Sequence, residues 1–180
     1  MMTLLILAFL MTAAPADRHD LMDLAAGPWV VVDDRVMGGV SQGNADFADG
    51  VFRFSGELSL DNNGGFSSAR LPLTRPLTGY RGIRLTVRGD GRSYQLRLRE
   101  GRRFDGVAWR TDFVASDKWT TIELPFDQFW PGFRGRAVPS AGPVDPDQIR
   151  QIGVLLGDKK PGTFAMELRS LEGIPADPAS

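Results

Sequence analysis

The sequence predicts an all-β protein, an antiparallel β-sandwich of the jelly-roll type. Short runs of β-branched, aromatic and alternating apolar residues recur along the 180-residue chain, and turn residues separate them. The 21 Gly, 12 Pro and 11 Phe residues are typical of a chain with many turns and short strands. Helical patterns are scarce, and the number and spacing of the runs, about nine, favour a jelly-roll-like sandwich.

Each expected strand lies between two turn signals. In the first part of the chain the runs are residues 29–32, 51–54, 57–60 and 66–71. In the second part they are residues 81–88, 93–99, 107–114, 119–124, 151–156 and 163–171, of which the last two are apolar enough to be central strands. Asp145 and Pro146 begin one expected short turn of helix over residues 145–150.

Residues 81–88 and 93–99 show the clearest alternation between apolar and polar positions. The apolar residues that share a face are Ile83, Leu85 and Val87 in the first run and Tyr94, Leu96 and Leu98 in the second. Residues 89–92, Gly-Asp-Gly-Arg, form a good hairpin turn because Gly tolerates positive φ. We therefore expect the two runs to be neighbours in one sheet. In residues 107–114 the expected inward positions are Trp109, Thr111 and Phe113.

Residues 1–16 predict a cleaved secretory signal peptide. They contain no charged side chain, and Ala14-Pro15-Ala16 fits a small-residue cleavage site. The apolar run from Leu4 to Met11 is shorter than the roughly 20 residues of a transmembrane helix. The alternatives are an uncleaved lipid-contacting anchor and a wrongly assigned start codon.

The remaining chain is long enough for one domain of ordinary size. We expect residues 17–174 to form a single β-sandwich domain and residues 175–180 to be a frayed tail. The leader predicts an exported, periplasmic protein. A cytoplasmic or inner-membrane-associated location is the alternative.

Composition and charge exclude several classes of function. With 21 Lys and Arg against 22 Asp and Glu, the net charge of −1 gives no overall attraction to nucleic acid or to an anionic membrane surface. The absence of Cys excludes disulfides, thiolate metal sites and thiol catalysis. We expect no cofactor.

The sequence offers no pair of residues suited to catalysis. His19, the only histidine, lies close to the expected new N-terminus and would have to be the base of any Ser-His-Asp triad. Asp33 and Asp34 are adjacent, so on a strand their side chains point to opposite faces and cannot form a dyad. Residues 61–63, Asp-Asn-Asn, could ligate Ca²⁺ through oxygens, but a hairpin turn is the simpler interpretation. We expect neither an enzyme nor a metal site.

Residues 33–43, DDRVMGGVSQG, are the most unusual stretch of the chain. Two glycines allow close approach of the backbone, but no helix pattern follows them and no Lys supplies charge for phosphate binding. One interpretation is an internal loop held by an Asp34–Arg35 pair, in which case Arg35→Ala destabilises the fold by about 1–3 kcal/mol for each acceptor left unpaired. The other is a contact surface that includes Asp34, Arg35, Met37, Gly38, Gly39 and Ser41.

Two long motifs of the chain are distinctive, DDRVMGGVSQG at residues 33–43 and GELSLDNNGGFSSAR at residues 56–70. They resemble the complex I intermediate-associated protein 30 family. Residues 119–124 and the Gln-Ile-Gly strand at residues 151–153 match later segments of the family pattern. The resemblance implies a galactose-binding-domain-like β-sandwich, a jelly roll that many carbohydrate-binding modules also use. It further implies a factor that assists assembly of respiratory complex I by binding, so the expected partner is a protein, a respiratory complex subunit or an envelope protein.

If residues 81–88 and 93–99 are paired, their polar sides form one basic face. This face contains Arg84, Arg88, Arg97 and Arg99. Like charges directly opposite each other are destabilising, so the arginines need counter-charges. One interpretation is a solvated surface neutralised by Glu100, Asp112 and Glu123. The other is a concave face on which arginines bind carboxylates of a partner or of an acidic glycan.

Residues 130–134, Trp-Pro-Gly-Phe-Arg, are expected on a Gly/Pro loop. Trp130 and Phe133 could stack on a sugar there, or Trp130 could attach the loop to the core. The leading hypothesis is a protein-binding module that uses the loop at residues 34–41 and the basic face. The alternative is an exported carbohydrate-binding module that uses the same face with Trp130 and Phe133.

Overall fold

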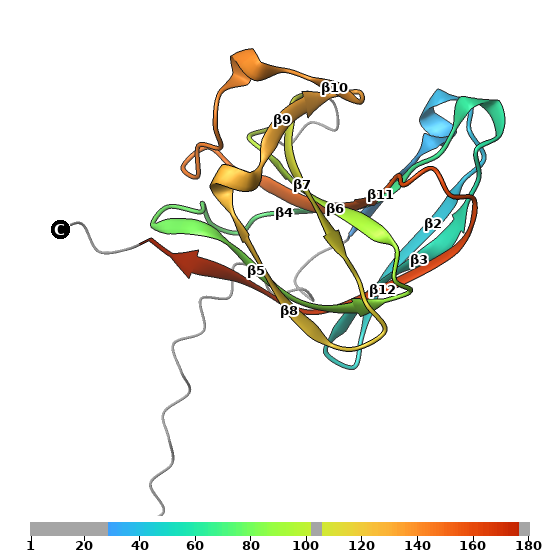
Figure 1. The fold of residues 1–180 in the computed structure, drawn as a ribbon, viewed down its shortest axis with the longest axis horizontal. Coiled ribbons are helices and arrows are strands. Elements are labelled where there is room, and N and C mark those ends of the chain that lie inside the picture. Colours follow the sequence, from blue (N-terminus) through green and yellow to red (C-terminus); the bar gives the residue numbers. More distant parts are fainter. Residues whose placement is uncertain (1–28, 102–105, 177–180) are drawn as a thin grey trace, which may run out of the picture.

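The protein is an antiparallel sandwich of two sheets, as the sequence predicts. The computed structural model describes residues 29–101 and 106–176, and the expected leader and His19 lie outside these ranges. Within them, twelve strands form the sandwich, joined by turns and four short 3₁₀ segments (Figure 1). The all-β class is therefore confirmed.

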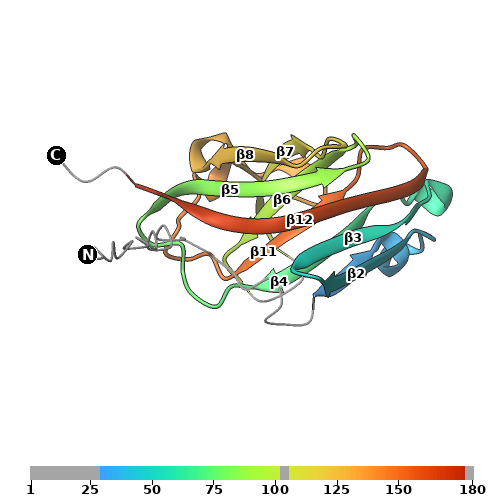
Figure 2. The same ribbon diagram turned by 90° about the horizontal axis from the view of Figure 1, so that it is seen from below.

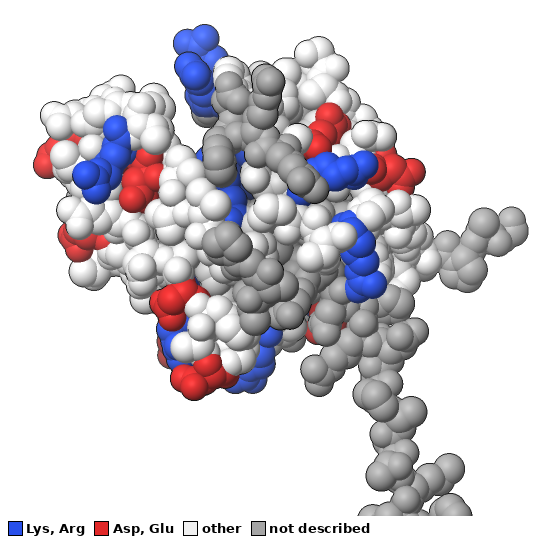
Figure 3. All heavy atoms as spheres, turned by 180° about the vertical axis from the view of Figure 1, so that it is seen from behind, with Lys and Arg blue, Asp and Glu red and all other residues white. Residues whose placement is uncertain are grey.

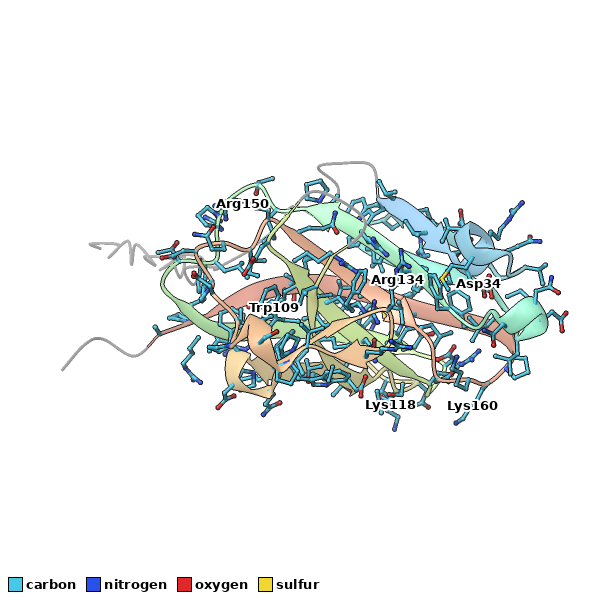
Figure 4. The ribbon with its side chains drawn as sticks, turned by 90° about the horizontal axis from the view of Figure 1, so that it is seen from above. Asp34, Trp109, Lys118, Arg134, Arg150 and Lys160 are labelled. Carbon is cyan, nitrogen blue, oxygen red and sulfur yellow. The ribbon has the colours of Figure 1, made fainter. Side chains whose placement is uncertain are left out.

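One layer is a seven-stranded sheet and the other a five-stranded sheet. The seven strands are, in spatial order, β1 (Val30–Asp33), β4 (Ser67–Pro72), β11 (Gln151–Leu156), β6 (Ser93–Arg99), β7 (Ala108–Val114), β9 (Trp130–Phe133) and β10 (Arg136–Ala137). The five strands are β2 (Gln42–Ala48), β3 (Val51–Leu58), β12 (Gly162–Pro175), β5 (Tyr80–Gly89) and β8 (Thr120–Pro125). Figure 2 shows the five-stranded sheet in front, and Figure 4 views the molecule from the opposite side.

The core lies between the sheets and is made by the inward side of each alternating strand. Ile83, Leu85 and Val87 of β5 face Tyr94, Leu96 and Leu98 of β6 across it, and all six side chains are buried. Burial of each large apolar side chain contributes about 1.5–3 kcal/mol. Trp109 and Phe113 of β7 also belong to the core, as predicted, and the central positions of β11 and β12 are confirmed. The alternation therefore identified the inward residues correctly.

The expected hairpin between residues 81–88 and 93–99 is wrong. β5 pairs with β12 and β8 in one sheet, whereas β6 pairs with β11 and β7 in the other. The connector at residues 90–92 crosses between the layers because its side chains are fixed to β12 and to the turn before it. Asp90 accepts hydrogen bonds from the Ala165 N–H (2.8 Å) and the Tyr94 hydroxyl (3.0 Å). Arg92 forms an ion pair with Asp158 at 2.7 Å.

Other departures occur where the alternation is weak. The sequence does not predict β2, β9 and β10, because Phe47 is the only large apolar residue in residues 42–48 and residues 130–137 contain Pro and Gly. Where one short turn of helix was predicted, residues 145–150 make a single hydrogen-bonded turn, in which the Gln148 N–H donates to the Asp145 carbonyl at 3.1 Å. At the other end of the domain, Pro175 is the last residue of β12 and the Ala176 N–H donates to the Gly79 carbonyl at 2.8 Å.

Candidate binding face

The outer side of the seven-stranded sheet brings together polar residues from strands that are far apart in the sequence. In one row across the sheet, Arg70 and Arg97 flank Gly153, and Arg110 pairs with both Arg97 and Trp130. In the next row, Gln151 lies opposite Arg99. We call this surface the arginine face. It consists of Arg70, Arg97, Arg99, Arg110, Trp130 and Gln151.

Two glycines let arginine side chains lie flat against this sheet. A Cβ on Gly153 would lie 3.1 Å from Cγ of Arg70 and 2.7 Å from the Ala69 carbonyl oxygen. A Cβ on Gly132 would lie 3.2 Å from Nε of Arg110. The guanidinium of Arg110 also lies 3.6 Å from the centre of the Trp130 ring, within the range of a cation–π interaction. The arginines are therefore held at the bottom of the face and do not extend into solvent.

A pocket lies between the two rows of the arginine face. It is lined by Ser68, Arg70, Arg97, Arg99, Gln151, Gly153 and Val154. Gln151 and Arg99 are only 4% and 8% exposed, although both lie on the outer side of the sheet. Nη1 of Arg99 donates to the Gly106 carbonyl at 2.8 Å.

Arg97 and Arg110 receive little compensation from the described residues. Arg97 donates two hydrogen bonds to Oε1 of Gln95, at 3.1 and 2.8 Å, and Arg110 donates one to the Gly135 carbonyl at 3.4 Å. No ion pair between described residues includes either arginine. Two polar atoms on this face, Nε of Arg110 and Oε1 of Gln151, are buried without a hydrogen-bond partner.

The charges on this face destabilise one another. Burial, followed by the neighbouring guanidinium groups of Arg110, Arg99 and Arg70, lowers the pKa of Arg97 to about 9. Burial and Arg99 lower the pKa of Arg70 to about 10. Burial also lowers the pKa of Arg110, and Asp112 offsets these effects only in part. A lowered pKa means that the surroundings disfavour the charged form, so an anion on this face would be favoured.

Arg84 and Arg88 do not belong to this face, contrary to the prediction. They lie on the outer side of the five-stranded sheet, because β5 belongs to that layer. Arg84 forms ion pairs with Glu123 at 2.7 Å and Glu172 at 3.8 Å, and Arg88 donates to Glu167. The arginines of this side of the molecule are therefore neutralised by pairing with glutamates. In the view from behind, which is turned away from this sheet face, Lys and Arg also lie near Asp and Glu (Figure 3).

The loop at residues 34–41, which we call the Asp34 loop, is organised by one buried carboxylate. Asp34 is 1% exposed and begins the 3₁₀ segment η1 (Asp34–Met37). It accepts hydrogen bonds from the Ser41 N–H (3.0 Å), the Ser41 hydroxyl (2.6 Å) and the N–H groups of Gly65 (2.6 Å) and Phe66 (3.3 Å). Burial alone would raise the pKa of Asp34, but these hydrogen bonds outweigh it and lower the pKa. Position 39 requires glycine, because the Cβ of any other residue there would lie 2.3 Å from the Asp34 carboxylate.

The expected Asp34–Arg35 pair does not form. Arg35 is exposed, and the partners of Asp34 are amides and a hydroxyl. Val36 and Met37 are also exposed, and Gly38 ends η1 in the left-handed region at φ +92°. In Figure 4 the labelled Asp34 lies toward one end of the molecule, away from Trp109. The Asp34 loop is therefore held from within and presents apolar side chains outward.

Trp130 and Phe133 lie on strand β9 and not on a loop. They are 40% and 37% exposed. Trp130 shares the outer side of the sheet with Arg110, but Phe133 is three residues further along, so alternation places it on the opposite side. The two rings do not form one stacking surface.

Sequence reasoning missed Arg70 and Gln151. Arg70 shares a side of β4 with Ser68, and this polar side was the available signal. β11, with the sequence QIGVLL, has no polar side and gave no such signal for Gln151. The position of Arg70 and Gln151 beside Arg97 depends on the pairing of β11 with both β4 and β6, which alternation does not determine. In the part of the chain that the structure describes, no group of three or more His, Asp or Glu residues could hold a metal ion. No described helix is long and apolar enough to cross a membrane.

A two-sheet jelly roll is an architecture that lectins and other binding modules use, among other proteins. The chain belongs to the family described as Complex I intermediate-associated protein 30 (CIA30), whose pattern matches residues 18–168. It is 25% identical over 174 residues to the mouse protein named Complex I intermediate-associated protein 30, mitochondrial, and 26% identical over 147 residues to the Drosophila melanogaster protein of that name. These matches cover 84% and 77% of this chain but only 53% and 49% of the relatives, so the chain spans about half their length.

Solved structures confirm the jelly-roll fold. The family 11 carbohydrate-binding module of the Clostridium thermocellum cellulase Lic26A-Cel5E superposes with a TM-score of 0.68 at 18% identity, over 92% of this chain and 97% of that one. The same kind of module from Clostridium thermocellum, in complex with a β-1,3-1,4-mixed-linked tetrasaccharide, gives 0.67 at 18% identity, over 90% and 98%.

Proposed function

We propose that this protein is a non-enzymatic binding module that holds a partner protein on the arginine face through the partner's carboxylates. The main support is the contrast between Arg97 and Arg84. Arg97 is in register with Gly153 and Arg110, whereas Arg84 is in register with Glu123 and Glu172. The arginine face thus lacks, at Arg97 and Arg110, the carboxylates that the opposite face supplies to its own arginines.

A carboxylate of a partner would supply the counter-charge that Arg97 and Arg110 lack among the described residues. A guanidinium presents planar donors that match a carboxylate, and such charge-assisted hydrogen bonds are about twice as strong as neutral ones. The stacking of Arg110 on Trp130 fixes one guanidinium before binding, so less side-chain freedom is lost in the complex. The Asp34 loop provides a second, apolar contact surface.

The family supports a protein as the partner. The mouse and fly relatives are named for association with complex I intermediates in mitochondria. This chain spans about half of those proteins, and we propose a respiratory complex subunit or an envelope protein as its partner. The exported location expected from residues 1–16 belongs to the same proposal.

Binding of a carboxylate-rich polypeptide tests the proposal. Poly-L-glutamate should bind the wild-type protein and Arg84→Gln equally, and should bind Arg97→Gln about tenfold more weakly or worse. Binding should also weaken between ~0.1 and 1 M salt, as the screening length falls from about 10 to 3 Å. Equal affinities for the two variants would overturn the proposal.

Crosslinking in the native host tests whether a partner protein meets this face. A photo-crosslinking residue replaces Asp112, which is exposed beside the arginine face, or Thr121, which is exposed on β8 of the other sheet. Crosslinks to the same protein from position 112 but not from position 121 would support the proposal. Crosslinks from position 121 alone would contradict it.

A second candidate function is carbohydrate binding on the same face. Trp130 favours it because the ring is 40% exposed beside a row of polar side chains. The family 11 module, which has the same fold, is known in complex with a mixed-linked tetrasaccharide. If the ligand is a neutral glycan, mixed-linked β-glucan should bind with an affinity that hardly changes with salt and is lost in Trp130→Ala.

A further inference from the structure

We propose that the pocket between Arg97 and Gln151 captures the C-terminal carboxylate of the partner protein together with the last backbone N–H of that protein. The inference rests on the proposed function, because it names the group of the partner that enters the arginine face. It follows from what the pocket offers to a ligand: cationic donors on one side and an unpaired acceptor on the other.

The donor side of the pocket is the guanidinium of Arg97. Within the described residues its hydrogen bonds use Nε and Nη2, both toward Gln95, so Nη1 has no partner there. Arg70 and Arg99 line the same pocket and add positive charge around it. A carboxylate is planar, has two acceptor oxygens and matches such donors.

The acceptor side is the side-chain amide of Gln151. Its Oε1 is buried without a hydrogen-bond partner, and the residue is 4% exposed. A buried acceptor without a partner costs about 1–3 kcal/mol, so a ligand that brings a donor to it gains more than a ligand with oxygens alone. The ligand group must therefore combine a carboxylate with a hydrogen-bond donor.

The floor and size of the pocket restrict what can enter. Gly153 leaves bare backbone between Arg70 and Arg97, since a Cβ there would lie 2.7 Å from the Ala69 carbonyl oxygen. The space between the described residues that line the pocket is small. The end of a chain can enter such a space while the rest of the partner lies across the face.

A protein C-terminus has the required chemistry in a fixed geometry. Its last N–H is attached to the carbon that bears the carboxylate, so one group can face Arg97 while the other faces Gln151. A Glu side chain has no donor held at a fixed distance from its carboxylate. Capture of a terminal carboxylate is an established mode of peptide recognition.

Titration with small molecules tests the need for a carboxylate and the need for an adjacent N–H separately. Side-chain NMR signals of Arg97 and Gln151 in the full chain are followed during titration with N-acetylglycine, propionate and N-acetylglycinamide. N-acetylglycine, which has both groups, should bind about tenfold more tightly than propionate, which has only the carboxylate. N-acetylglycinamide, which has no carboxylate, should not bind.

Two variants assign the effect to the pocket. Gln151→Met removes the acceptor at similar size and should bring N-acetylglycine down to the affinity of propionate, while propionate is unchanged. Arg84→Gln, on the other sheet, should leave all three titrations as in the wild type. Equal affinity for N-acetylglycine and propionate in the wild-type protein would overturn the inference.

The remaining outcomes separate this inference from the proposed function. Tighter binding of galacturonate than of N-acetylglycine would overturn capture of a protein terminus in favour of an acidic glycan. If none of the acids binds while poly-L-glutamate still distinguishes Arg97→Gln from Arg84→Gln, the pocket inference fails and the proposed function stands. If poly-L-glutamate does not distinguish them, the proposed function fails as well.

Discussion

The outer sides of the two sheets both present arginines, but their surroundings differ. On the five-stranded sheet, Arg84 lies between Glu123 and Glu172 in the neighbouring strands and forms an ion pair with each. On the seven-stranded sheet, Arg97 lies between Gly153 and Arg110, and no ion pair of the described residues includes it. The residue type and the alternation are the same, so the difference comes from the neighbouring strands.

We propose that this difference separates a structural surface from a binding surface. Exposed ion pairs of the kind Arg84 makes contribute about 0–1 kcal/mol each, and they leave little charge for a ligand. Partly buried charges without counter-ions oppose folding and are retained where binding needs them. We therefore expect the seven-stranded sheet to contribute less to the stability of the free protein than its buried area suggests, and to gain stability when a ligand binds.

The largest expected effect comes from a buried charge that is fully satisfied. Asp34→Ala removes the acceptor of four hydrogen bonds from Ser41, Gly65 and Phe66. Because the donors remain buried, the free energy of unfolding should fall by about 3 kcal/mol or more. Denaturant unfolding measures this change, and it shows how much a compensated charge stabilises the fold.

Arg35→Ala is the matched control for Asp34→Ala. Arg35 is exposed and is not among the partners of Asp34, so its removal should change the free energy of unfolding by less than about 0.5 kcal/mol. Destabilisation by Arg35→Ala as large as that of Asp34→Ala would restore the Asp34–Arg35 pair that the sequence suggested.

Acid should reveal the carboxylates that stabilise each region. The pKa of Asp34 is lowered by its hydrogen bonds, which outweigh burial, and the pKa of Glu167 is lowered chiefly by the hydrogen bond from Arg88. A carboxyl with a lowered folded pKa stabilises the fold above its unfolded pKa, which is about 4. That contribution is lost as the pH falls through the folded pKa.

The free energy of unfolding measured at a series of pH values should therefore decrease below about pH 4. Asp34→Asn should decrease less steeply over the same range, because it lacks one of the titrating groups. Parallel curves for the variant and the wild-type protein would show that the Asp34 carboxyl is not stabilised in the fold.

A smaller effect, of opposite sign on the two sheets, is expected from removing an arginine. Arg97→Met replaces an uncompensated charge by an apolar chain of similar length and should raise the free energy of unfolding by about 1 kcal/mol. Arg84→Met leaves Glu123 and Glu172 without their partner and should lower it by about 0–1 kcal/mol. Thermal unfolding of both variants measures these two changes in stability. Destabilisation by Arg97→Met would contradict the view that Arg97 is an uncompensated charge.

The inward residues of the sandwich could be predicted because alternation is a local property. Leu85, Leu96 and Trp109 were placed correctly from spacing alone. The hairpin predicted at residues 89–92 was wrong, because a strand with one apolar side can pack on the core from either sheet. The choice depends on the contacts of Asp90 and Arg92 with residues near the end of the chain.

The candidate site was less predictable for the same reason. Arg97 was assigned to the correct side of its strand, but its neighbours Arg70 and Gln151 come from strands more than 20 residues before and 50 residues after it. The partner of Asp34 was misassigned because a neighbouring arginine is visible in a sequence, whereas backbone amides that converge from residues 65 and 66 are not.

The smallest effect concerns salt, which should act on the two faces in opposite directions. Between ~0.1 and 1 M NaCl the screening length falls from about 10 to 3 Å. Screening weakens the attraction of Arg84 for its glutamates but also weakens the repulsion between Arg97, Arg70 and Arg110.

Because many other charges respond to salt, the useful quantity is the difference in the free energy of unfolding between each variant and the wild-type protein. The gain in the free energy of unfolding from Arg97→Met, about 1 kcal/mol, should shrink by roughly a third as salt rises. The loss in the free energy of unfolding caused by Arg84→Met should shrink too. If the Arg97→Met difference does not change with salt, repulsion within the arginine face is not its source, and the cost of burying Arg97 is desolvation alone.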